Sequence, residues 1–219
     1  RQMCIRDRDF SDSTRVIAFA SGGGLGLPDR DYYLKLDARS KEIRAKYEAH
    51  LATMFALAAE APEVAKRSAA TVMRIETALA KASLPRVEKR GPYKLFHKMD
   101  LKALQKTTPG FDWKAYLAAL GQPGVNSFNV TEPAFFKAFN QQLAAEDLGA
   151  IKTYLRWHVL EAMAPALSPQ FDEPHFAFFM QTLRGVERQQ PRWKRCVQLV
   201  DRQLGEALGL CLQLGDQRL

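Results

Sequence analysis

Apolar residues recur at helical spacing through most of the chain. They fall at every third or fourth position between residues 40 and 58, and a second run with the same period covers residues 63–82. Such spacing places the apolar side chains on one face of a helix. Shorter runs of the same kind cover residues 100–106, 113–117, 131–143, 147–163, 174–183 and 191–208. Only residues 125–130 alternate in the manner of a half-buried strand.

The residues at the ends of these runs support the same interpretation. Ser40, Asp112 and Asp147 stand where a side chain can cap the N-terminus of a helix. Pro174 and Pro191 stand where proline opens one. The pattern predicts an all-α fold of about seven packed antiparallel helices, with at most one short β-hairpin.

Composition limits the classes of protein that this chain can represent. The 219 residues are 47% hydrophobic and 26% charged, which is typical of a globular protein with a buried core. No apolar run approaches the roughly 18–20 residues that a membrane-spanning helix needs. The net charge of +8 allows an anionic partner. The basic residues within 81–106 and 184–202 are interleaved with acidic ones, however, so a solvated surface is the favoured interpretation.

Both ends of the chain differ in character from the rest. Residues 1–8 read like translated adapter sequence, and we expect them to be a leader foreign to the gene. Residues 211–219 form a doubtful tail that we expect to follow a frameshift or a truncation. The cysteines Cys4, Cys196 and Cys211 have no disulfide or metal-site spacing. We expect Cys196, the one outside these ends, to be a buried thiol.

A search for catalytic chemistry finds no active site. None of the four histidines lies in an H-E-x-x-H pattern. His158 and Glu161 are spaced to share a helix face, but one histidine and one glutamate make a weak metal site, and we expect His158 to pack beside Trp157. The Gly22–Gly26 segment lacks the frame of a phosphate-binding loop and is interpreted as a tight structural turn. The residues therefore assign no catalytic, cofactor-binding or metal-binding position.

Four stretches, in order and at matching spacing, carry a resemblance to a known family. They are residues 24–34 (GLGLPDRDYYL, preceded by 12–17), residues 90–99 (RGPYKLFHKM, just after a helix with Arg74-Ile75-Glu76), residues 154–158 (YLRWH) and residues 191–197 (PRWKRCV, continuing to 204–209). Together they resemble the N-terminal helical region of the neprilysin family of zinc metallopeptidases, which includes endothelin-converting enzymes and bacterial oligoendopeptidases. In the last stretch we expect Pro191 to start a helix and Trp193 to anchor its inner face.

The resemblance implies a zinc endopeptidase that acts on peptides and is secreted, periplasmic or on the cell surface. In this family the zinc ligands and general base come from an H-E-x-x-H motif and a later glutamate, in a C-terminal catalytic domain that this chain lacks. Residues 9–210 would form a helical cap that helps to enclose a chamber limiting substrate size. The implied partners are peptide substrates and that catalytic domain, with no nucleic acid and no zinc in this chain. The alternative is a stand-alone helical binding module that uses the basic clusters on an anionic partner.

Overall fold

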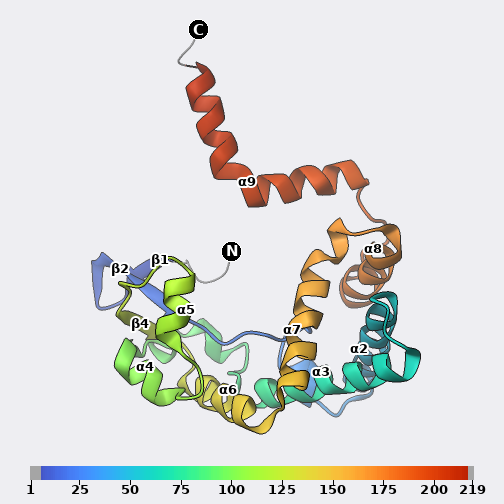
Figure 1. Cartoon of the computed structure of the whole chain (residues 1–219), viewed down its shortest axis with the longest axis horizontal. Helices are drawn as coiled ribbons and strands as arrows, with labels where there is room; N and C mark the ends of the chain where they lie inside the picture. The colour runs from blue at the N-terminus through green and yellow to red at the C-terminus, as the bar shows by residue number, and fades with distance from the viewer. Residues whose placement is uncertain (1–5, 217–219) are drawn as a thin grey trace. The chain divides into compact units, whose positions relative to one another are not determined.

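The computed structural model describes residues 6–216, and the chain divides into two compact units, Arg1–His158 and Val159–Leu219. The expected leader, residues 1–8, and the expected tail, residues 211–219, include residues 1–5 and 217–219, which lie outside the described residues. Helices make up most of both units, so the predicted helical fold class is confirmed (Figure 1).

The helices of the first unit follow the predicted order. They are α1 (Asp31–Leu34), α2 (Ala38–Leu57), α3 (Pro62–Ala82), the short 3₁₀ turns η1 (Glu88–Arg90) and η2 (Pro92–Leu95), α4 (Leu101–Thr107), α5 (Trp113–Ala119), α6 (Pro133–Ala145) and α7 (Leu148–Met163), which continues into the second unit. The predicted caps Asp112 and Asp147 accept backbone N–H groups of Ala115 and Ala150 at 2.9 and 2.8 Å.

One predicted helix start is displaced. Asp37, not Ser40, caps α2, because its carboxylate accepts both the backbone N–H and the hydroxyl of Ser40, at 2.9 and 2.7 Å. Ser40 therefore serves as a donor within the first turn, and the helix begins at Ala38.

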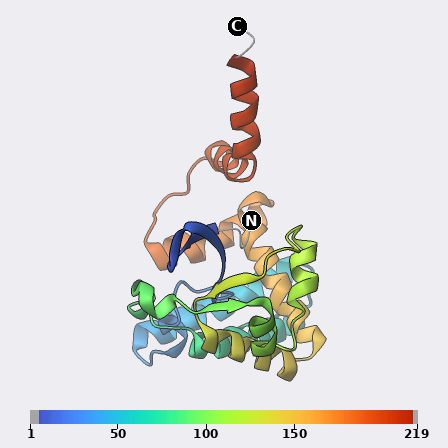
Figure 2. The same cartoon turned by 90° about the vertical axis from the view of Figure 1, so that its left-hand side faces the viewer.

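The β-structure is larger than the single hairpin that the sequence predicts. The strands β1 (Arg6–Asp9), β2 (Asp12–Ala20), β3 (Lys98–Asp100) and β4 (Ser127–Val130) form one sheet in the order β1-β2-β4-β3 (Figure 2). β1 and β2 form an antiparallel hairpin, β2 and β4 are parallel, and β3 and β4 are antiparallel. The alternation at residues 125–130 marks β4, whereas β1 and β3 have only four and three residues, which is too short to establish a period of two.

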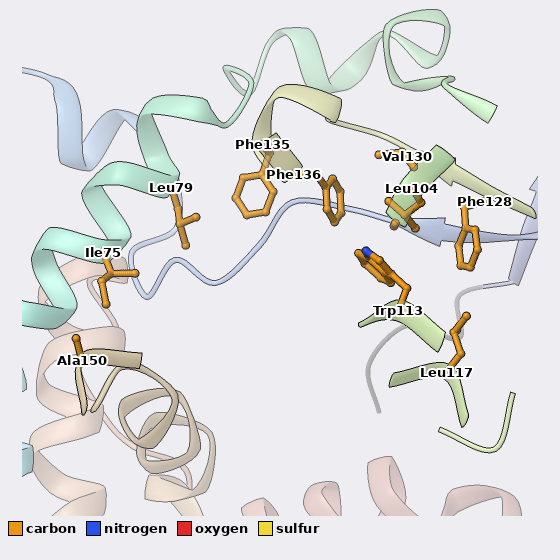
Figure 3. Packing of buried hydrophobic residues seen from close by; sticks show 11 residues of the cluster. Ile75, Leu79, Leu104, Trp113, Leu117, Phe128, Val130, Phe135, Phe136 and Ala150 are labelled. Atoms are coloured by element: carbon orange, nitrogen blue, oxygen red, sulfur yellow. The ribbon is translucent and has the colours of Figure 1, made fainter. Parts of the chain in front are cut away.

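One buried core of the first unit lies where this sheet meets the helices. Figure 3 shows Phe128 and Val130 of β4 facing Leu104 of α4 and Trp113 of α5. The same cluster continues through Phe135 and Phe136 of α6 to Ile75 and Leu79 of α3 and Ala150 of α7. Apolar side chains from separate stretches of sequence therefore form one continuous buried cluster, which fixes the sheet against α3 and α6.

In the second unit, one helix begins five residues earlier than the sequence predicts, at Pro169 instead of Pro174. This unit comprises the end of α7, η3 (Ala164–Ala166), α8 (Pro169–Phe176), the π-helical segment η4 (Ala177–Thr182) and α9 (Arg192–Asp216). The sequence predicts that Pro174 opens a helix, but Pro174 lies inside α8. α8 starts instead at Ser168 and Pro169, because serine at the N-cap followed by proline at the first helical position favours a helix N-terminus. From the sequence, Pro169 is interpreted only as a residue that ends the preceding helix.

A buried ion pair holds the start of α9 against α8. Arg195 donates from two guanidinium nitrogens to the two carboxylate oxygens of Asp172, both at 2.8 Å. The side-chain amide of Gln189 donates to the same carboxylate at 2.9 Å. Asp172 is buried, so this fork-shaped pairing satisfies a charge that would otherwise destabilise the unit.

Candidate functional site

The glycine segment between β2 and α1 is held against the helices by hydrogen bonds to its backbone. The N–H of Gly26 donates to Oε1 of Glu76 at 3.1 Å, and the carbonyl of Gly24 accepts from the hydroxyl of Tyr154 at 2.7 Å. The N–H of Leu27 donates to the hydroxyl of Tyr33 at 2.9 Å. In a phosphate-binding loop the backbone amides are free to bind an anion, but here the amide of Gly26 is already bound to the Glu76 carboxylate. The structure therefore agrees with the interpretation as a structural turn.

Two of the glycines are needed because tyrosine hydroxyls approach the backbone closely. A Cβ at Gly26 would lie 1.9 Å from Oη of Tyr47, and a Cβ at Gly24 would lie 2.1 Å from Oη of Tyr154. Gly24 also has a φ of +75°, which favours glycine. Any side chain at either position would displace the tyrosine that closes the segment.

Glu76 is the centre of this arrangement. Its side chain is completely buried, and it accepts from the hydroxyl of Tyr33 at 2.7 Å and from that of Tyr47 at 3.2 Å, in addition to Gly26. Burial, with a further contribution from the Glu76 charge, raises the pKa of both tyrosines. The two hydroxyls therefore stay protonated and keep donating to the carboxylate.

Trp157 connects the same cluster to α7. Its indole N–H donates to the hydroxyl of Tyr47 at 3.0 Å, and its ring lies edge-on to those of Tyr47 and His50, with centroids 6.0 and 5.8 Å away. Trp157 has no exposed surface. Helices α2, α3 and α7 are thus joined by one largely buried polar network, which we call the Glu76 cluster (Tyr33, Tyr47, Glu76, Tyr154, Trp157 and His158).

His158 lies in this cluster through Glu76 and Tyr154, and its expected packing beside Trp157 stays a prediction. Its Nε2 is 3.5 Å from Oε1 of Glu76, and its ring packs edge-on against Tyr154 at a centroid distance of 4.6 Å. Burial lowers the pKa of His158 more than its hydrogen bond to the Gly24 carbonyl raises it. Its carboxylate neighbour is thus Glu76 rather than Glu161, the residue that its spacing suggested.

An apolar pocket opens next to the glycine segment. It has a volume of about 270 Å³, and its lining consists of Ser21, Gly23, Gly24, Leu79, Phe111, Trp113, Tyr116, Phe135, Phe136, Phe139 and Tyr154. Its floor belongs to the buried core, since Leu79, Trp113, Phe135 and Phe136 are all buried (Figure 3). Phe111, Tyr116, Phe139 and Tyr154 remain partly exposed at its rim. No charged residue lines it.

The basic clusters are partly neutralised by acidic side chains. Lys89 pairs with the buried Glu132 at 3.0 Å, Lys94 pairs with Glu88 at 3.4 Å, and Lys98 pairs with the buried Asp9. In the second cluster Arg195 is held by Asp172. These contacts favour a solvated, paired surface over an anion-binding one.

Two expectations for the last helix are wrong. Cys196 is a free thiol and is exposed, not buried. Trp193 has 65% of its surface exposed, so it does not anchor an inner face within the described residues, although the ammonium of Lys194 lies 5.4 Å from its ring centroid. Helical periodicity identified an apolar face here but could not show what covers it.

Comparison with known proteins identifies the family. A family model described as "Peptidase family M13" matches residues 4–212. The chain belongs to peptidase family M13. Endothelin-converting enzyme 1 from Cavia porcellus and from Homo sapiens are each 27% identical over 209 residues, covering 92% of this chain and 27% of those proteins. The chain thus spans about a quarter of the length of these relatives.

Solved structures agree with the M13 assignment. The zinc metalloprotease Zmp1 of Mycobacterium tuberculosis in its open state superposes with a TM-score of 0.87 at 32% identity, covering 97% of this chain and 32% of that one. The same protease with an inhibitor gives 0.86 at 31% identity, covering 94% and 31%. The resemblance to the N-terminal region of the neprilysin family is therefore confirmed.

The M13 family implies zinc, and the residues present do not fit a zinc site. Within residues 6–216, no group of three histidine, cysteine, aspartate or glutamate side chains is placed to hold a metal ion. The ligands around Glu76 are tyrosine hydroxyls, a backbone amide and one imidazole, which form a hydrogen-bonded set rather than a tetrahedral metal shell.

Sequence reasoning missed the Glu76 cluster, although two of the resembling stretches and the helix that precedes a third meet in it. Gly26 and Tyr33 come from the first stretch, Glu76 from the helix before the second, and Tyr154, Trp157 and His158 from the third. A signal was present, because Glu76 lies on the same helical face as Val72, Leu79 and Ala80. A glutamate on an apolar face indicates a buried carboxylate with donors around it.

Proposed function

We propose that this chain is the N-terminal part of a zinc-dependent metalloendopeptidase that cleaves peptides. The observation that carries the proposal is the M13 match over residues 4–212, together with relatives that are about three to four times as long. The similar solved protein is named a zinc metalloprotease, and the curated relatives are named endothelin-converting enzymes.

The zinc and the catalytic residues of the proposed enzyme lie outside this chain. The sequence has no H-E-x-x-H motif. When bound, zinc would supply an activated water that attacks the scissile carbonyl. The residues of this chain would hold the fold of the helical region through the Glu76 cluster and would take no part in bond cleavage.

This region would help to enclose the chamber that limits substrate size, with the C-terminal catalytic domain as its partner. The face of α9 supports this part of the proposal. Trp193, Val197, Val200 and Leu204 recur at i, i+4, i+7 and i+11, and all four are exposed. A helix face of this kind marks a surface that packs against another structure.

A secreted, periplasmic or cell-surface location forms part of the proposal and rests on the family resemblance. None of the helices in residues 6–216 combines the length and the apolar character that crossing a membrane requires. Fractionation of source cells, with an antibody against residues 38–82, would test the location: a signal confined to the cytosolic fraction would contradict it.

The experiment that tests the function starts from genomic DNA downstream of codon 210. We expect an open reading frame that encodes H-E-x-x-H. The longer chain should cleave a fluorogenic peptide in a chelator-sensitive, zinc-restored manner, and residues 1–219 alone should cleave nothing. The matched control is the longer chain with the motif glutamate changed to glutamine. Chelator-sensitive cleavage by residues 1–219 would show that the chemistry lies elsewhere.

A further inference from the structure

The aromatic pocket beside the glycine segment is not explained by the fold alone. Four aromatic side chains around this pocket, Phe111, Tyr116, Phe139 and Tyr154, pack against the buried core and keep part of their surface in water. A concave apolar site with a buried floor and an accessible aromatic rim is the usual form of a small ligand site.

The lining restricts the chemistry of what can enter. No charged side chain lines the pocket, so a charged ligand would lose its hydration without compensation. The indole N–H of Trp113 is already used, because it donates to the hydroxyl of Thr108 at 2.6 Å. The hydroxyl of Tyr154 is used as well, on the Gly24 carbonyl. The pocket therefore selects an uncharged, apolar group.

The size of the pocket points to one ring or one branched aliphatic group. An apolar cavity of roughly 150 Å³ is enough to hold benzene. The volume here is about 270 Å³, which leaves room for a phenyl or indole ring and its first methylene group. It is too small for the face of a helix.

The mouth of the pocket is suited to an extended chain. Ser21, Gly23 and Gly24 line it and are all exposed. A Cβ at Gly23 would meet no atom within 4 Å, so open space lies directly above this glycine. Backbone can approach backbone most closely where side chains are absent.

We infer that this pocket binds an aromatic or large aliphatic side chain of a peptide, as a recognition site that belongs to the helical region itself. The inference rests on the proposed peptidase function, since it takes the ligand to be a peptide. It adds a preference for an apolar residue in the substrate that would be set by this chain and not by the catalytic residues.

Nuclear magnetic resonance on residues 1–219 tests the inference. The chain has three tryptophans, and Trp113 alone lines the pocket, so its indole N–H reports occupancy while Trp157 and Trp193 serve as internal references. Titration with N-acetyl-phenylalanine amide should shift the Trp113 signal saturably, with a Kd of about 1 mM, because one side chain buries little area. N-acetyl-alanine amide should produce no saturable shift.

Glycine substitutions provide a matched pair. Gly23→Leu adds a side chain at the exposed part of the pocket lining and should weaken binding about tenfold or more, while Gly23→Ala should weaken it less. Gly124→Leu adds the same side chain at an exposed position that also meets nothing within 4 Å, and it should leave binding unchanged. Melting curves of both leucine variants should match that of the parent.

The outcomes separate this inference from the peptidase proposal. Binding that requires the aromatic ring and is lost only in Gly23→Leu supports it. No Trp113 shift, equal shifts with the alanine amide, or equal loss in the two leucine variants overturns it. A pocket that responds in residues 1–219 but not in the longer chain also overturns it, because the protein itself then fills the site. None of these measurements involves hydrolysis, so failure of the peptidase assay is a distinct result.

Discussion

The Glu76 cluster and helix α9 differ in how the environment matches the side chains: one buries a charged residue, and the other exposes apolar ones. In α3 a glutamate lies on the apolar face, and the fold surrounds it with hydroxyl and amide donors. In α9 apolar residues lie on one face, and more than 40% of each side chain from Trp193 to Leu204 on that face is exposed. The first region provides hydrogen-bond partners for its buried glutamate within the chain, and the second leaves an apolar face in contact with solvent.

The largest expected effect comes from removing the carboxylate at the centre of the first region. Glu76→Ala leaves two buried hydroxyls and one amide N–H without their acceptor, and we expect the free energy of unfolding to fall by about 3–5 kcal/mol. Urea denaturation followed by circular dichroism measures this. Glu63→Ala is the matched control, since Glu63 is on the same helix and pairs with Lys66 in solvent. A loss in the control as large as that for Glu76→Ala would contradict the role of the cluster.

A pair of leucines compares the two regions directly. Leu51 of α2 has no exposed surface, and Leu204 of α9 is 54% exposed. Leu51→Ala should lower the free energy of unfolding by about 2–5 kcal/mol, because it leaves a cavity. Leu204→Ala should change it by less than about 0.5 kcal/mol in residues 1–219. A large loss for Leu204→Ala in this chain would show that α9 is already packed, which would end the contrast.

Substitutions in the glycine segment should change the free energy of unfolding less, and Gly23 provides a control for Gly26. Gly26→Ala brings a Cβ within 1.9 Å of Oη of Tyr47, and we expect it to lower the free energy of unfolding by about 1–3 kcal/mol. Gly23→Ala meets nothing within 4 Å and should be neutral or slightly stabilising. Thermal melting of the two variants checks this, and the comparison fails if they melt together.

The smallest expected effect is a dependence on pH through His158. Burial lowers its pKa in the folded chain below the ordinary value of 6.5, so the unfolded chain takes up this proton first as the pH falls. Stability should therefore be unaffected by this group above about pH 6.5 and should decrease below it, by at most about 1.4 kcal/mol per pH unit. Urea unfolding at pH 7.5 and 5.5 measures the slope. His158→Gln should reduce it, and an unchanged slope would assign the effect to other groups, such as His175.

Local signals in the sequence determined the helices and several of their ends. Asp112 and Asp147 cap the helices that their positions predicted, since a cap involves only the next three residues. The same local reasoning failed at Pro174, because the Ser168-Pro169 pair can both end one helix and start another. It also missed the sheet, because the pairing of β2 with β4 joins residues more than a hundred positions apart.

The sequence by itself determined the helical class and, through four short stretches, the resemblance to M13 peptidases. The tertiary structure alone decided that two of those stretches meet around Glu76, that Cys196 and Trp193 are exposed, and that an aromatic pocket opens beside the glycine segment. The physical reason is the separation along the sequence of the residues that interact. Helical period and capping depend on residues within a few positions of one another, whereas burial, hydrogen-bond partners and pockets depend on side chains that only the folded chain brings together.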